Sequence, residues 1–192
     1  MSERRRALLI AGAVVAGLLL VGLVLWLSRR DGSTSTRDAG GTEVDSTGPM
    51  VSVTLYYPSL SDRRLHAEER SIPESTREEK VRSIVAALLE GPQSQMLAAP
   101  LPGTIELAGV FFGEGGVIYL DLRQPDQERP PALGSLEELL AVYSLVDSVA
   151  LNTPGIDRVA LLWNGSQPES FSGHVDTARP LTPNRKLLAE SP

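Results

Sequence analysis

The sequence predicts an α+β domain in which two amphipathic helices pack on a mainly antiparallel or mixed β-sheet, preceded by one transmembrane helix. Three observations indicate this class: a long uncharged apolar segment, short segments in which apolar and polar residues alternate, and two longer segments with apolar residues at helical spacing. In chain order the domain is ββαββαββ. Each helix has one apolar stripe, so a two-layer arrangement on one face of the sheet buries both stripes.

The transmembrane helix is predicted at residues 7–27, "ALLIAGAVVAGLLLVGLVLWL". A helix of this length spans about 30 Å, the thickness of the hydrocarbon core of a bilayer. A cleaved signal peptide has a shorter apolar part of about 7 to 15 residues that ends in small residues, whereas this segment ends in "LWLSRR". We therefore expect a retained signal anchor, with the short tail 1–6 in the cytoplasm, residues 7–27 in the membrane and the domain outside the cytoplasm.

Charge and composition exclude several functions. The 192-residue chain has a formal net charge of −6, and because residues 1–30 contribute +4, residues 31–192 carry −10. An acidic domain repels phosphate backbones, so we expect no binding to nucleic acid. The chain has no cysteine, which removes disulfides, thiolate metal sites, cysteine nucleophiles and a lipid anchor on cysteine.

The domain is predicted at residues 50–184, between a flexible linker at 28–49 and a C-terminal tail at 185–192. From residue 31 to 49 the linker contains one sizeable apolar side chain, Val44, and cannot offset the entropy cost of ordering. A linker of this composition reaches about 25 Å, so it would hold the domain close to the membrane.

The first half of the domain holds two strands and a helix. Alternation predicts strands at 51–57 and 64–72. Ser75 and Glu78 fit the S-x-x-E capping box at the start of the helix, which runs to "LLEGP". A phosphate-binding glycine would open a helix, whereas Gly91 closes this one and Pro92 prevents its continuation.

The second half repeats a helix-and-strand order. Its elements are predicted as strands at 104–112 and 117–122, a helix at 135–151, a strand at 156–163 and a last strand within 169–181. The first two strands form a hairpin across "GEGG", in which Ile105, Leu107 and Phe111 share one face. Ser135 and Glu138 fit a second capping box.

Candidate catalytic residues are few. The two histidines, His66 and His174, lie in no metal-binding motif, and we interpret them as ordinary structural or surface residues. Asp121 in "YLDL" is the most interesting carboxylate, but without a partner it fits a strand-end acceptor of hydrogen bonds better than a catalytic group. We therefore predict a protein that is not an enzyme, with no cofactor and no metal.

Aromatic residues decide how well the sequence supports a glycan-binding module. Tyr57, Phe111 and Trp163 fall on apolar strand faces, where packing in the core is expected, while Tyr56 and Phe171 are the candidates for exposure. The possible exposure of these two side chains is the support for the alternative function, a module that binds peptidoglycan or another glycan.

Several segments in order resemble the GerMN domain of sporulation and spore-germination proteins: "LLEGP", "LPGT", "YLDL" and "GHVDTARPL". The resemblance covers about residues 50–184. The motif positions it singles out, which we expect to be structural, are Leu89, Gly91, Pro92, Pro102, Gly103, Asp121, Gly165, Gly173, Asp176 and Pro180.

The resemblance implies a non-enzymatic extracytoplasmic domain that supports protein complexes at the bacterial cell envelope, in sporulation or germination. Envelope proteins are then the expected partners, and peptidoglycan is a second candidate. The expected location is the bacterial cytoplasmic membrane, with the domain on its periplasmic or extracellular side. Two features depart from the sporulation members: a single copy of the domain and the absence of a lipid-accepting cysteine.

Overall fold

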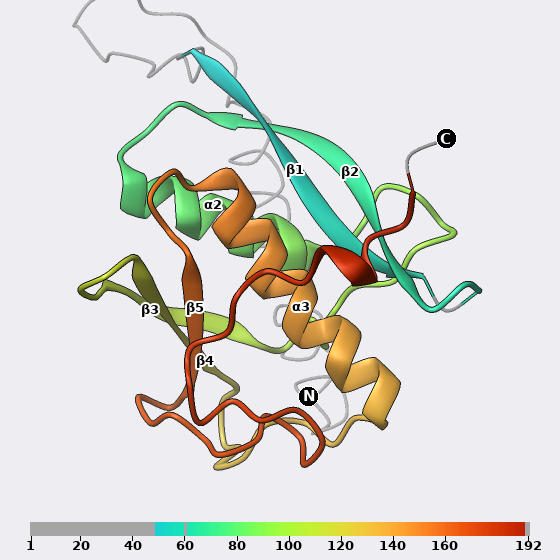
Figure 1. Cartoon of the computed structure of the whole chain (residues 1–192), viewed down its shortest axis with the longest axis vertical. Coiled ribbons are helices and arrows are strands. Elements are labelled where there is room, and N and C mark those ends of the chain that lie inside the picture. Colours follow the sequence, from blue (N-terminus) through green and yellow to red (C-terminus); the bar gives the residue numbers. More distant parts are fainter. Residues whose placement is uncertain (1–48, 60, 191–192) are drawn as a thin grey trace, which may run out of the picture. The chain divides into compact units, whose positions relative to one another are not determined.

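The computed structural model describes residues 49–59 and 61–190, which form an α+β fold with two helices and two β-sheets (Figure 1). The elements are β1 Met50–Ser59, β2 Arg64–Pro73, α2 Arg77–Glu90, β3 Glu106–Phe112, β4 Val117–Arg123, α3 Ser135–Asn152, β5 Arg158–Trp163 and the short 3-10 helix η1 Arg185–Leu187. Within these residues no helix is both long enough and apolar enough to cross a membrane. The predicted anchor at 7–27 lies outside the described part of the chain.

The strands form two sheets where the sequence predicted one. β1 and β2 pair antiparallel as a hairpin, and the second sheet has the order β3-β4-β5. β3 and β4 are antiparallel, while β4 and β5 are parallel because α3 connects them. The mixture of parallel and antiparallel pairs was predicted and is confirmed.

The last predicted strand, within 169–181, is wrong. This segment is a loop that makes two isolated bridges, Ser170 with Asp176 and Leu181 with Val159. The second bridge lies at the outer edge of β5, so this segment pairs with β5 through a single residue, Leu181, and forms no strand there.

Both helices contribute apolar side chains to one core, as their spacing predicted. From α2 the buried residues are Val81, Ile84, Val85 and Leu88. They pack with buried residues of α3 and of both sheets in a single cluster. The apolar stripes of both helices and the inner faces of both sheets therefore form a single hydrophobic core.

Both predicted capping boxes are shifted by one residue. The N-cap of α2 is Thr76, whose side chain accepts the N–H of Glu79, and the Glu79 carboxylate accepts the N–H of Thr76. In α3 the N-cap is Gly134, whose N–H donates to Glu137. The predicted pairs Ser75–Glu78 and Ser135–Glu138 are wrong, because in each case the neighbouring residue has the cap geometry.

The predicted environments of two phenylalanines are also reversed. Phe171 is 2% exposed and lies edge-on to Trp163, while Phe111 is 54% exposed. The cause at Phe111 is a register shift between Leu107 and Gly109, which moves later residues of β3 to the opposite face. Ile105 is buried, so it does not share a face with Phe111.

Candidate protein-binding edge

The predicted motif positions lie in four parts of the fold. They are the end of α2 (Leu89, Gly91, Pro92), the loop before β3 (Pro102, Gly103), the end of the β4–β5 pair (Asp121, Gly165) and the loop after β5 (Gly173, Asp176, Pro180). Asp121 and Gly165 are bonded to each other, since the Gly165 N–H donates to Oδ1 of Asp121 (2.8 Å). Asp121 thus accepts a backbone hydrogen bond at a strand end, as predicted.

The end of α2 is fixed by the Gly91 carbonyl. Gly91 caps the helix with φ 103° and ψ 174°, and its N–H donates to the Ala87 carbonyl. The Gly91 oxygen accepts from Arg70 Nη2 (2.8 Å), and it lies 3.1 Å from the Tyr57 hydroxyl, whose shorter hydrogen bond is to the Ala87 carbonyl (2.7 Å). Gly91 ends the helix as predicted, and it also bonds the helix to β1 and β2.

A buried glutamate fixes the loop after β5. Glu138 on α3 is fully buried, and its carboxylate accepts the backbone N–H groups of Ser172 (2.7 Å), His174 (2.8 Å) and Val175 (3.0 Å). It also contacts the ring nitrogen Nδ1 of His174 at 2.8 Å. Burial acts to raise the pKa of Glu138, but these hydrogen bonds outweigh it and the pKa is lowered.

Sequence reasoning assigned Glu138 to a helix cap and so missed this role. The available signal was its position on the helix: Glu138 shares a face with Ala141, Val142 and Leu145, which are all buried. An acid on an apolar face needs several hydrogen-bond donors.

Glu138 and His174 resemble the acid and base of a catalytic triad, so the hydroxyls nearby are informative. Ser170 Oγ donates to Glu138 itself (3.3 Å), and Ser172 Oγ donates to the Pro131 carbonyl. Neither hydroxyl is bonded to His174, as a nucleophile activated by this base would be. These bonds describe a loop held by a carboxylate.

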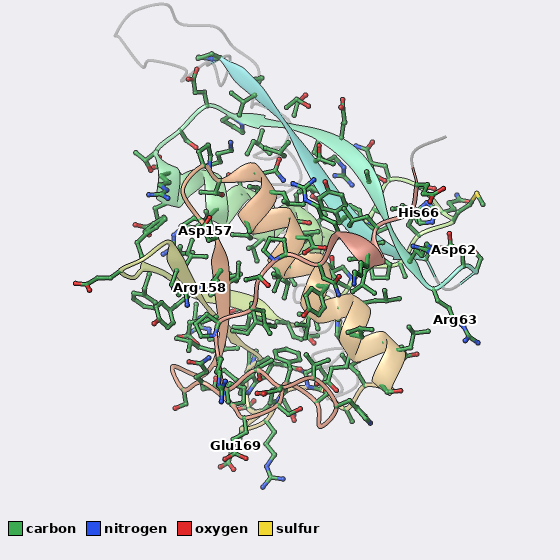
Figure 2. All side chains as sticks on the ribbon, viewed as in Figure 1. Asp62, Arg63, His66, Asp157, Arg158 and Glu169 are labelled. Atoms are coloured by element: carbon green, nitrogen blue, oxygen red, sulfur yellow. The ribbon has the colours of Figure 1, made fainter. Side chains whose placement is uncertain are left out.

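His66 lies in the β1–β2 hairpin, where Asp62 and His66 are next to each other (Figure 2). Their side chains are 2.6 Å apart and both are exposed. In residues 49–59 and 61–190, no three side chains of His, Asp or Glu gather as a metal site would require.

One edge of the β1–β2 hairpin is covered by side chains of α3. Asn152 Oδ1 accepts the Thr54 N–H (2.9 Å) and its Nδ2 donates to the Thr54 carbonyl (2.6 Å). Ser148 Oγ accepts the Tyr56 N–H, and Ser144 Oγ donates to the Tyr56 carbonyl. Polar residues one helical turn apart thus take the place of a neighbouring strand at the β1 edge.

The other edge of this hairpin, along β2, is largely open. Since Thr54 and Tyr56 point their backbone groups away from β2, the antiparallel register also points those of Glu69 and Ala67 away from β1. By the same alternation Ser71 points outward. Among residues 49–59 and 61–190, cover is found only at the start of this edge, where the Ala189 N–H donates to the Leu65 carbonyl (2.8 Å) and Leu188 bridges Leu65 in parallel.

A groove runs between this open edge and α2. Its cavity volume is about 650 Å³, and its walls are Glu69, Arg70, Ser71 and Ile72 from β2, Ser83, Ala86, Ala87 and Glu90 from α2, and Gln93. The small side chains on α2 leave room beside the strand. Arg70 is bonded to Glu68 and Gly91, whereas the exposed Glu69 and Glu90 form no ion pair within the described residues, so the groove is acidic.

Asp147 on α3 is a second buried carboxylate. Its side chain is fully buried, Oδ1 accepts the Asn184 N–H (2.8 Å), and Oδ2 has no partner in the described part of the chain. Burial raises the pKa of Asp147 to about 6, against the opposing effects of the Asn184 N–H and Arg185. At neutral pH the domain therefore carries a buried charge with one unpaired oxygen.

We expect Asp147→Asn to stabilise the domain at pH 7.5 by about 1–2 kcal/mol. The folded-state pKa lies above the ordinary value, so the stabilising effect of protonation is complete below about pH 4 and is lost as pH rises through about 6. Urea unfolding of the full-length chain at pH 5 and 7.5 measures this. A variant whose unfolding free energy falls between these pH values as steeply as that of the parent would contradict the assignment.

These features define a class of protein: a small α+β domain built from a helix-covered hairpin and a three-stranded mixed sheet. The family model described as "Germane: Sporulation and spore germination" matches residues 54–169. The chain belongs to this family and carries a GerMN-like domain, as the sequence motifs indicated. No curated protein sequence matches the chain.

Solved structures support the fold. The tandem GerMN domains of the sporulation protein GerM from Bacillus subtilis match with TM-score 0.55 and 14% identity, over 80% of this chain and 51% of that one. The first GerMN domain of GerM matches with TM-score 0.50 and 18% identity, over 71% and 98%. A candidate lipoprotein from Clostridium perfringens matches with TM-score 0.50 and 19% identity, over 78% and 93%.

Proposed function

We propose that this protein is a single-pass, membrane-anchored assembly module of the bacterial envelope that has no enzymatic activity. In this proposal its extracytoplasmic domain binds an extended segment of another envelope protein along the open edge of β2. The partner segment forms backbone hydrogen bonds with Ala67, Glu69 and Ser71, which is recognition by strand addition. Lys or Arg side chains of the partner face Glu69 and Glu90.

The observation that carries this proposal is the open edge of β2 beside an acidic groove. An unpaired strand edge is a template for pairing with another chain unless it is covered. Here side chains of α3 cover the edge of β1, while the edge of β2 stays open within the described residues. The chain's own tail already pairs with this edge at Leu65. The apolar segment 7–27 and the linker support an anchored location, and the family description supports a role in sporulation or germination.

A photo-crosslinking residue at position 69 of the full-length chain tests the proposal in cells, with position 114 in the β3–β4 turn as the control. We expect position 69 to capture a defined envelope protein through a segment that contains Lys or Arg, and position 114 not to capture it. Equal capture at both positions, or a crosslinked segment inside a helix, would contradict strand addition.

Two changes should then weaken the captured complex. Ser71→Pro removes an outward N–H from an edge where proline is tolerated, and we expect a loss of about tenfold in affinity for a peptide of the captured segment. Glu69→Lys with Glu90→Lys should weaken binding further at low salt, while Glu114→Lys, a surface change outside the groove, should leave it unchanged. Unchanged affinity in both groove variants would exclude this edge.

A further inference from the structure

We propose that the open face of the β3-β4-β5 sheet is a second binding site, and that its ligand is a neutral polysaccharide chain. Both helices pack on the opposite face, where Val110, Ile118, Leu120, Val159 and Leu161 are buried. The open face holds an aromatic pair, Phe111 and Tyr119, which the β3–β4 register places directly opposite each other.

Both aromatic rings lean along the sheet over neighbouring glycines. Ring atoms of Phe111 lie 2.7 Å from the point where a Cβ on Gly109 would stand, and a ring atom of Tyr119 lies 2.8 Å from the corresponding point at Gly113. Each ring therefore occupies the space that a missing side chain leaves. Phe111 keeps 54% of its surface exposed in this position, so the side chain is accessible to a ligand.

Polar groups lie at both ends of this aromatic pair. By strand alternation Asp121 and Arg158 project from the same face as Tyr119, on the two sides of it along the sheet. Asp121 uses Oδ1 for the Gly165 N–H, which leaves Oδ2 as an acceptor, and Arg158 donates to the Gly115 carbonyl (3.2 Å). Figure 2 labels Arg158 at the start of β5.

This combination fits a sugar chain better than a protein. The C–H groups on one face of a sugar ring carry partial positive charge and stack on the negative face of an aromatic ring, while its hydroxyls bond to carboxylates. A protein partner is usually anchored by a side chain that enters a pocket or protrudes from the surface, and two rings that lean over glycines along the strands provide neither. A neutral chain also avoids repulsion by the acidic domain.

Binding of the full-length chain in detergent to a soluble, fully N-acetylated chito-oligosaccharide, which carries no charge, tests the proposal. We expect Phe111→Ala to weaken binding about three- to tenfold. Phe112→Ala is the matched control, because this neighbour is 41% exposed but projects to the opposite face, beside Arg77. It should leave binding unchanged.

Gly109→Ala provides a second variant that keeps both aromatic rings. The added Cβ would meet the Phe111 ring at 2.7 Å and must lift it from the sheet, so binding should fall here too. Binding that survives in both variants, or no binding by the parent chain, would overturn the proposal. Sedimentation velocity is the last check: a dimer of the parent that dissociates in Phe111→Ala would assign this face to a second copy of the chain instead.

Discussion

Replacing Glu138 with Gln is expected to destabilise the domain by about 2–4 kcal/mol at pH 7. The carboxylate is fully buried and accepts three backbone N–H groups of the loop after β5. Glutamine keeps one oxygen and places an NH₂ group against N–H donors, so at least one buried donor loses its acceptor. Urea unfolding of the full-length chain measures the loss.

Glu137→Gln is the control, because Glu137 is the neighbouring residue, is exposed, and accepts one N–H from Gly134. We expect it to cost less than about 1 kcal/mol. Hydrogen exchange gives an independent readout: in Glu138→Gln the N–H groups of residues 172–175 should exchange faster than in the parent. Equal losses of stability in the two variants would show that Glu138 does not hold this loop.

The same substitution should change the response to acid. Because the folded-state pKa of Glu138 is lowered, its stabilising contribution is present above the ordinary glutamate value and is lost as pH falls through the folded value. Asp147 acts in the opposite direction and at higher pH, since its folded-state pKa is about 6. The two buried acids of α3 can therefore be separated by pH: the Glu138 effect lies below about 4.5, and the Asp147 effect lies mainly between about 4 and 6.

The sequence predicted the helices well, because their signals are local. Apolar spacing and Gly91 define α2 to within about two residues at each end. It could not choose the capping residue, since Ser75 with Glu78 and Thr76 with Glu79 both fit the S-x-x-E pattern. Only the backbone geometry at Thr76 decides between them.

The division into two sheets depends on contacts between residues far apart in the chain. Ser144, Ser148 and Asn152 look like an ordinary polar helix face, yet they bond to the backbone of β1 and occupy the edge where another strand could pair. The open β2 edge follows from the same contacts. For this reason the sequence led to a predicted role in protein binding but could not name the strand edge at which we propose it.

Replacing Gly91 with Ala is the second change with a large expected effect, a loss of about 1–3 kcal/mol in the free energy of unfolding. A φ of 103° with ψ of 174° is a backbone conformation that essentially only glycine adopts. Space is not the cause, since an added Cβ would be 3.5 Å from Ala99, an ordinary contact. If the backbone relaxes, the Gly91 carbonyl turns away from Arg70 Nη2, and that hydrogen bond is lost instead, while Tyr57 keeps its bond to the Ala87 carbonyl.

Gly103→Ala separates this backbone effect from the general cost of changing a motif glycine. Gly103 also belongs to a predicted motif, but an added Cβ there meets nothing within 4 Å, and its φ is not positive. We expect that variant to be neutral or slightly stabilising, by up to about 1 kcal/mol.

The two glycine variants should also differ in binding. Because Arg70 and Glu90 form part of the groove beside β2, Gly91→Ala should weaken binding of the proposed partner segment, whereas Gly103→Ala should not. If Gly91→Ala and Gly103→Ala changed the free energy of unfolding equally, the backbone conformation of Gly91 would not be the reason that glycine is needed at position 91.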